Sequence, residues 1–215
     1  MSYDAVVFDN DGVLTELTPH EVIRDAVRET FREFDADPSP EAVEALVGED
    51  VDAIYRVCDK YDPDPEQLWS RREANATSAQ KEAIDGGIKG LFDDVDALRE
   101  FDATRGVVSN NQHATVEYIV EAFDLRNLFS VAIGREPTLD GFRNRKPNPH
   151  YLERAVSTVK ADSVLYVGDS NVDVVAARRA GMDVAFLRRE HRNGYELQAE
   201  PTYEIESLAE LPALV

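Results

Sequence analysis

The sequence predicts an α/β protein, built on a Rossmann-like, three-layer parallel sheet with an inserted helical domain. Three observations predict this fold class. Residues 5–8 are apolar and valine-rich and end at two aspartates, as is typical of a strand buried on both faces of a parallel sheet. From residue 86 onward, strand-like and helical stretches alternate, which is the order of a sheet covered on both faces. Residues 15–85 show only helical periodicity.

The helical stretch directly follows the first strand. Ser39 followed by Pro40 is a helix start, and Gly48 and the pair Gly86-Gly87 are helix stops. The expected helices cover residues 19–34, 40–47, 50–61 and 66–84. We therefore expect residues 15–85 to form a helical domain, hinged near its glycines and inserted into an α/β core made of residues 1–14 and 86–215.

The rest of the chain supplies the other strands of the expected sheet. Expected strands cover residues 104–108, 129–133, 163–167, 183–187 and 202–205, and expected helices cover residues 91–101, 113–123, 149–159, 172–180 and 207–211. We expect two polar segments, residues 134–145 and residues 188–200, to be loops. We interpret His191 and the neighbouring arginines as solvated surface residues; contact of this arginine-rich stretch with a phosphorylated substrate is the alternative.

The chain is strongly acidic. It has 215 residues, with 43 Asp and Glu against 23 Lys and Arg, for a net charge of −20. This charge argues against nucleic acid and anionic membranes as partners. The acids are scattered, which leaves two interpretations: a role for the acidity itself, such as binding a basic partner or buffering cations, or a solvated surface adapted to high salt. We favour the halophilic interpretation.

Cysteine usage and apolar runs indicate the compartment. Cys58 is the one cysteine of the sequence, so no internal disulfide forms, as expected in a reducing cytoplasm. No apolar run reaches membrane-spanning length, and the first strand begins too early to leave room for a signal peptide. We expect a soluble, cytoplasmic protein.

Polar side chains follow several of the expected strands at the point where each strand ends. In a parallel sheet these ends meet at one edge, where ligands bind. A further polar site precedes a helix, in Arg145-Lys146-Pro147. The residues expected at this edge are Asp9, Asp11, Ser109, Asn110, Lys146, Asp169 and Asp173.

This combination of residue types indicates the chemistry of the site. Several carboxylates repel a phosphate unless a divalent cation is present. Oxygen ligands without a His or Cys pattern select a hard ion, and Mg²⁺ is the first choice. A lysine and a hydroxyl group suit a phosphoryl group, since they neutralise and orient its oxygens.

The same residues carry a resemblance to a known family. Asp9-Asn10-Asp11-Gly12-Val13-Leu14, then Ser109, Lys146 and Gly168-Asp169-Ser170-Asn171-Val172-Asp173 resemble, in order, the four motifs of the haloacid dehalogenase superfamily. The helical insert resembles the C1-type cap of that superfamily. By its motifs the chain is most similar to the phosphoglycolate phosphatase and β-phosphoglucomutase-like branch.

The resemblance implies a role for each catalytic residue. Asp9 would be the nucleophile that forms an aspartyl-phosphate, and Asp11 would be the general acid and base. Ser109 and the backbone N–H of Asn110 would hold the phosphoryl oxygens. Lys146 would neutralise the phosphoryl charge and keep Asp9 in place.

The resemblance also implies a metal site. Asp9, the backbone carbonyl of Asp11, and Asp169 would bind Mg²⁺, and Asp173 would support the ion directly or through water. Asn10 departs from the family pattern, since an apolar residue is common between the two aspartates. The long approach to Lys146 leaves Lys146 as the first choice for the phosphate-binding cation, with three alternatives: Arg135, Arg143 and Arg145.

The expected function is that of a Mg²⁺-dependent phosphatase acting on a small phosphorylated metabolite, as a monomer or a homodimer. The alternative is a phosphomutase of the β-phosphoglucomutase type. A haloacid dehalogenase proper needs no metal and lacks the second aspartate, so Asp11 argues against it. A phospho-accepting receiver module is about half this length and leaves the insert unexplained. The sequence does not indicate the substrate.

Overall fold

The computed structural model describes residues 3–48 and 50–215. The chain forms two compact units. The α/β unit comprises Met1–Leu17, Gly90–Arg135 and Asn144–Val215. The helical unit comprises Thr18–Lys89 and Glu136–Arg143. The helical unit thus combines the stretch that follows the first strand with a short segment from much later in the sequence.

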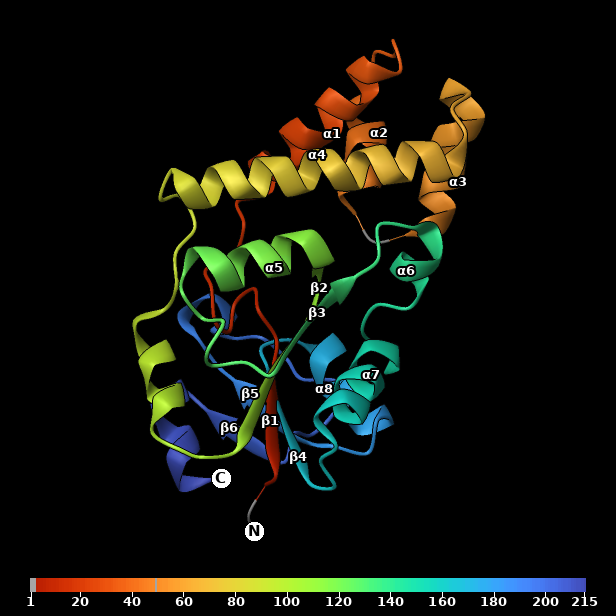
Figure 1. The fold of residues 1–215 in the computed structure, drawn as a ribbon. Coiled ribbons are helices and arrows are strands. Elements are labelled where there is room, and N and C mark those ends of the chain that lie inside the picture. The colour runs from red at the N-terminus through yellow and green to blue at the C-terminus, as the bar shows by residue number, and fades with distance from the viewer. Residues whose placement is uncertain (1–2, 49) are drawn as a thin grey trace. The chain divides into compact units, whose positions relative to one another are not determined.

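A parallel sheet forms the centre of the α/β unit (Figure 1). Its strands are β1 (Ala5–Phe8), β2 (Thr104–Gln112), β3 (Val131–Arg135), β4 (Val164–Gly168), β5 (Asp183–Leu187) and β6 (Tyr203–Ile205). Their spatial order is β3-β2-β1-β4-β5-β6, and every neighbouring pair is parallel. The predicted α/β class with a Rossmann-like parallel sheet is therefore confirmed.

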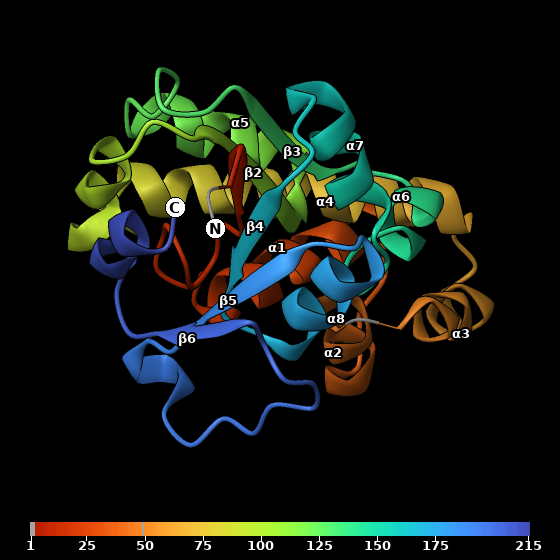
Figure 2. The ribbon, with the colours of Figure 1, turned by 90° about the horizontal axis from the view of Figure 1, so that it is seen from below.

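Alternating side chains of β1 explain why both faces of the sheet are covered. Val6 and Phe8 belong to one apolar cluster, and Ala5 and Val7 belong to another, because successive residues of a strand point to opposite faces. The first cluster includes side chains of η1 (Asp93–Arg99), α5 (His113–Ala122) and η3 (Leu208–Ala213). The second includes side chains of α7 (His150–Val159) and α8 (Asn171–Arg179). Figure 2 shows these layers along the sheet.

The helical unit is held together by its own apolar core. Its helices are α1 (His20–Glu33), α2 (Pro40–Val47), α3 (Val51–Tyr61), α4 (Pro65–Asp85) and α6 (Leu139–Arg143). The Ser39 hydroxyl caps α2 and the Asp64 carboxylate caps α4, each followed by a proline at the first helical position. The ring of Trp69 packs against that of Phe142 of α6, with centroids 4.5 Å apart.

Several predicted elements differ from the structure in extent or type. The helix predicted at residues 91–101 is the 3₁₀ helix η1, and the strand predicted at residues 104–108 continues as β2 to Gln112, with a register shift beyond Val108. In η1 the Asp94 carboxylate caps η3 by accepting hydrogen bonds from Ser207 and Leu208. This tertiary contact outweighs the α-helical periodicity of the segment.

Two segments predicted as loops contain short helices. Residues 134–145 include α6, because Leu139 and Phe142 are buried in the core of the helical unit. Residues 188–200 include the 3₁₀ helix η2 (Glu190–Arg192). Within the described part of the chain, no helix has the length and apolarity needed to cross a membrane.

Candidate active site

The strand order brings the predicted site residues to one edge of the sheet. β1 lies between β2 and β4, and Phe8 pairs with Val107 on one side and Val167 on the other. The residues that follow these strand positions, among them Asp9, Ser109 and Asp169, therefore gather at the carboxyl edge, where open α/β sheets bind ligands.

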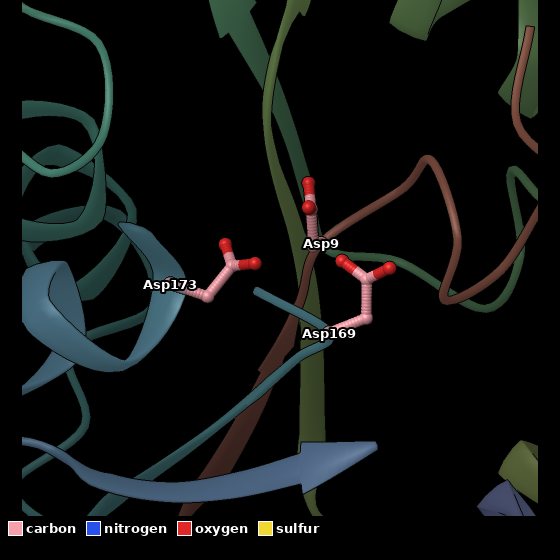
Figure 3. Close-up of side chains that lie close together, drawn as sticks. All are labelled: Asp9, Asp169 and Asp173. Atoms are coloured by element: carbon pink, nitrogen blue, oxygen red, sulfur yellow. The ribbon is translucent and has the colours of Figure 1, made fainter. Parts of the chain in front are cut away.

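Three buried carboxylates form the centre of the site (Figure 3). Asp9 follows β1, Asp169 follows β4, and Asp173 lies in the first turn of α8. One carboxylate oxygen of each lies within 4.8 Å of the others. The three residues are at most 8% exposed. We call Asp9, Asp169 and Asp173 the acid triad.

Lys146 is the counter-ion of the acid triad. Its Nζ lies 2.8 Å from Oδ1 of Asp9 and 2.7 Å from Oδ1 of Asp173. It also donates to the hydroxyl of Tyr166 at 2.8 Å and to the carbonyl of Val108 at 3.3 Å. Since Lys146 is only 2% exposed, its charge is directed at these groups and not at solvent.

Burial and the neighbouring charges shift the titration of this cluster. Burial raises the pKa of Asp9 to about 8; Asp173 and Asp169 add to the rise, and Lys146 opposes it. Burial alone lowers the pKa of Lys146, but the Asp173 and Asp9 carboxylates outweigh it and hold that pKa above its usual value. The ammonium group of Lys146 therefore stays charged.

Asp173 uses both of its carboxylate oxygens within the protein. Oδ1 accepts from Lys146 and from the Tyr166 hydroxyl, the latter at 3.1 Å. Oδ2 accepts from the backbone N–H of Ser170 at 3.1 Å and from the Ser170 hydroxyl. Burial raises the pKa of Tyr166 well above its usual value, so the phenol remains a donor. Asp173 thus orients Lys146, and Tyr166, which was not among the predicted site residues, supports both.

Asp169 is held from the other side of the triad. Its Oδ2 accepts from Nε2 of His191 at 2.7 Å and from Nε of Arg192 at 2.9 Å. His191 is exposed to solvent, as predicted, but its ring and the Arg192 side chain also contact Asp169, which the interpretation as solvated surface residues did not include. The contact arises because η2 returns toward the end of β4, which no local sequence pattern reports.

Asp11 lies beside the residues that end β2. Its Oδ2 accepts from the side-chain amide of Asn111 at 3.0 Å and lies 3.5 Å from the hydroxyl of Ser109. The Ser109 hydroxyl accepts from the backbone N–H of Asn111 at 3.1 Å. The structure therefore brings Asp11 and Ser109 together, and it adds Asn111, which the sequence did not single out.

Asn110 fixes the backbone of Lys146. Its side-chain oxygen accepts from the Lys146 N–H at 2.8 Å, and its side-chain nitrogen donates to the Lys146 carbonyl at 3.0 Å. Of the alternative cations, Arg135 donates to the Asn110 carbonyl at 2.7 Å, and Arg143 donates to Tyr55 within the helical unit. Lys146 is the cation that contacts Asp9.

Asn10 is buried, and its side chain contacts Thr15. Its side-chain nitrogen donates to the hydroxyl of Thr15 at 3.1 Å, and its carbonyl accepts from the N–H groups of residues 13–15. Gly12 closes this turn at a φ of +84°. A Cβ atom at Gly12 would lie 2.3 Å from Oδ2 of Asp169, so only glycine lets the two segments approach.

The donor set of the acid triad fits a hard divalent cation. Asn10 and Lys146 contact Asp9 through its Oδ1, and His191 and Arg192 contact Asp169 through its Oδ2. Among the described residues, Oδ2 of Asp9 and Oδ1 of Asp169 accept no hydrogen bond, although both residues are buried. Two open carboxylate oxygens are the ligand type that Mg²⁺ prefers.

Comparison with known proteins shows full-length similarity. The chain is 26% identical to the pyrophosphatase PpaX of Halalkalibacterium halodurans over 222 aligned positions, which cover 100% of this chain and 98% of that protein. It is 26% identical to the phosphoglycolate phosphatase of Rhodobacter capsulatus, with 87% of this chain and 85% of that protein covered.

A solved structure shows the same fold. The crystal structure of CbbY from Rhodobacter sphaeroides in complex with phosphate superposes with a TM-score of 0.71 at 22% identity, covering 98% of this chain and 96% of that one. The sequence profile of the haloacid dehalogenase-like hydrolases matches residues 6–187. The resemblance seen in the motifs is confirmed, and the chain belongs to the haloacid dehalogenase-like hydrolase family.

Proposed function

We propose that this hydrolase is a Mg²⁺-dependent phosphatase that releases phosphate from a small phosphorylated metabolite through an aspartyl-phosphate on Asp9. The observation that carries the proposal is the ion pairing of Lys146 with both Asp9 and Asp173 inside a buried acid triad. A buried cation at this position offsets the repulsion between an anionic nucleophile and an anionic phosphate.

In the first half of the reaction, a carboxylate oxygen of Asp9 attacks phosphorus and the bond from phosphorus to the leaving oxygen breaks. Asp11 gives its proton to that oxygen. Ser109, which is 2% exposed and lies beside Asp11, and the backbone N–H of Asn110 would hold the phosphoryl oxygens.

In the second half, Asp11 takes a proton from water, and the water oxygen attacks phosphorus. The bond to Asp9 breaks, inorganic phosphate leaves, and the Asp9 carboxylate and protonated Asp11 are restored. The contact of Asn111 with Oδ2 of Asp11 keeps the carboxyl group of Asp11 at the side of the site formed by Ser109.

Asp9, the backbone carbonyl of Asp11, and Asp169 would hold Mg²⁺, which supplies positive charge that lowers the pKa of Asp9 and draws in the phosphate. Asp173 would support the ion through water, since its oxygens already accept from Lys146, Tyr166 and Ser170. This assignment uses the two open carboxylate oxygens and leaves the counter-ion of Lys146 intact.

The relatives suggest the size of the substrate. One carries the name pyrophosphatase and another the name phosphoglycolate phosphatase, and both names denote small phosphorylated compounds. We extend that substrate class to this chain. The helical domain at residues 15–85, together with residues 136–143, would act as a cap that excludes water selectively from a core made of residues 1–14, 86–135 and 144–215.

The surrounding conditions follow from composition. We propose that the protein is cytoplasmic and acts as a monomer or a homodimer. We further propose that its net charge of −20 reflects adaptation to high salt and disfavours nucleic acid and membrane partners. Thermal unfolding followed from dilute buffer to multi-molar KCl checks the salt adaptation. The unfolding temperature rises with KCl if screening relieves self-repulsion, and a flat or falling profile would contradict it.

The proposed function is tested by a phosphate-release screen on the purified full chain in multi-molar KCl. The panel includes phosphoglycolate, pyrophosphate, β-glucose 1-phosphate and p-nitrophenyl phosphate, each with Mg²⁺ and with EDTA. We expect phosphate release with Mg²⁺ and none with EDTA. Turnover that persists in EDTA contradicts the mechanism, and turnover of a sugar phosphate only with a bisphosphate activator identifies a phosphomutase.

A further inference from the structure

The segment that follows β5 is braced against the α/β unit. Arg189 donates to the carbonyl of Val13 at 2.7 Å and pairs with Asp94 at 2.8 Å. Arg188 donates to the carbonyls of Arg192 and Tyr195. The Arg188 and Arg189 contacts therefore hold this segment in addition to the side chains that reach the acid triad.

His191 and Arg192 project from this braced segment onto Asp169. Nε2 of His191 and Nε of Arg192 lie 2.7 Å and 2.9 Å from the same oxygen, Oδ2. Because a carboxylate accepts only, Nε2 of His191 carries the proton of this hydrogen bond. Two donors on one oxygen fill its two lone pairs and fix the plane of the carboxylate.

The other oxygen of Asp169 remains available. Oδ1 accepts no hydrogen bond among the described residues, and Figure 3 shows the Asp169 carboxylate directed toward Asp9. A donor that competed with a cation would occupy the oxygen facing the triad. Here both donors lie on the oxygen next to Gly12, whose hypothetical Cβ would be 2.3 Å from Oδ2.

We propose that His191 and Arg192 are positioning residues of the metal centre: they hold Asp169 through Oδ2 so that Oδ1 is presented to the divalent cation. This inference rests on the proposed Mg²⁺ site. Arg192 also brings positive charge near the cation, which opposes binding. The orientation effect prevails, since partners that orient a ligand typically change metal affinity by about 10–100-fold.

The test is a Mn²⁺ titration of the full chain without substrate, in which electron paramagnetic resonance counts the free ion. We expect His191→Leu and Arg192→Leu each to bind Mn²⁺ about 10–100-fold more weakly than the wild type. His191→Gln and Arg192→Lys retain a donor and restore most of the affinity. Arg126→Leu, which removes an exposed arginine paired with Glu117, is the matched control and leaves the affinity unchanged.

Several outcomes overturn the inference while leaving the proposed function standing. Unchanged or tighter Mn²⁺ binding in both leucine variants shows that the two side chains do not position Asp169. A directly bound nitrogen in the pulsed spectrum of the wild-type Mn²⁺ complex makes His191 a ligand instead. Equal loss of affinity in His191→Gln and His191→Leu shows that the hydrogen bond is not the cause.

A wild-type chain that does not bind Mn²⁺ overturns the proposed metal site as well, so the two failures are distinguishable. Thermal unfolding of each variant without metal separates loss of fold from loss of affinity. The positioning role requires that His191→Gln unfolds at the wild-type temperature and binds Mn²⁺ with wild-type affinity. It also requires that His191→Leu is folded but binds Mn²⁺ weakly.

Discussion

Charged side chains have different roles in two regions of the molecule, the buried site of the α/β unit and the exposed surface of α1. In the α/β unit, Lys146 is 1% exposed and pairs with Asp9 and Asp173, which are 12% and 0% exposed at the side chain. On α1 of the helical unit, Arg24, Arg28 and Arg32 pair with acids of the same or a neighbouring helix, and their side chains are 33–68% exposed.

The difference shows that burial, not the number of ion pairs, determines what a charge does. A buried pair costs desolvation and is retained where geometry must be fixed. An exposed pair is screened by salt and contributes little to stability. The helical unit also contains a buried pair, Arg72 with Glu73, which shows that the contrast follows burial and not the unit.

The largest effect is expected at the buried lysine. Lys146→Met keeps the volume and removes the charge, so phosphate release should fall by roughly 10²–10³-fold or more, as when a preorganised donor is lost at a reacting oxygen. Lys60→Met, on the exposed side of α3, is the control and should retain full activity. A kcat/KM of Lys146→Met within a few-fold of the wild-type value would contradict the proposed difference between buried and exposed charges.

A smaller effect, on stability, is expected at the partly buried pair of Asp94 and Arg189. Asp94→Ala leaves Arg189, Ser207 and the N–H of Leu208 without their carboxylate, so the free energy of unfolding should fall by roughly 2–4 kcal/mol. Urea unfolding in multi-molar KCl measures the loss. Glu204→Ala, which breaks the exposed pair with Arg188, should cost much less, and equal losses in the two variants would remove burial as the deciding factor.

The smallest effect is expected on α1. Arg28→Ala removes contacts with Glu21 and Asp25, but all three side chains face solvent. Its unfolding midpoint in multi-molar KCl should equal that of the wild type, since salt screens the pair. A large drop at high salt would mean that this exposed cluster stabilises the helical unit in a way that screening does not weaken.

The sequence predicts the fold and the core of the site because both depend on local signals. Buried strands end at polar residues, and parallel topology brings those ends together, so Asp9, Ser109 and Asp169 could be expected at one edge. The roles assigned to them stay predictions until activity is measured. The triad geometry and the ion pairs of Lys146 are what the structure adds.

The sequence could not predict the supports of the site, because they depend on tertiary contacts. Tyr166 is an ordinary inward residue of β4, yet it donates to Asp173. His191 lies in an irregular segment with no periodicity, yet it reaches Asp169. The same reason explains why residues 93–99 form the 3₁₀ helix η1 and not the predicted α-helix: Asp94 accepts hydrogen bonds from Ser207 and Leu208 at the start of η3. The spacing of residues along the sequence carries no information on such long-range contacts.

The most direct test of the account is whether Asp9 becomes phosphorylated. The full chain is acid-quenched during turnover of the phosphate ester that it hydrolyses fastest. It is then digested, and the masses of its peptides are measured by mass spectrometry. The account predicts one added phosphoryl group on the peptide that contains Asp9. In a folded Asp9→Asn variant, both this phosphoryl group and phosphate release should be absent. Phosphate release by Asp9→Asn, or a phosphoryl group on another residue, would contradict the account.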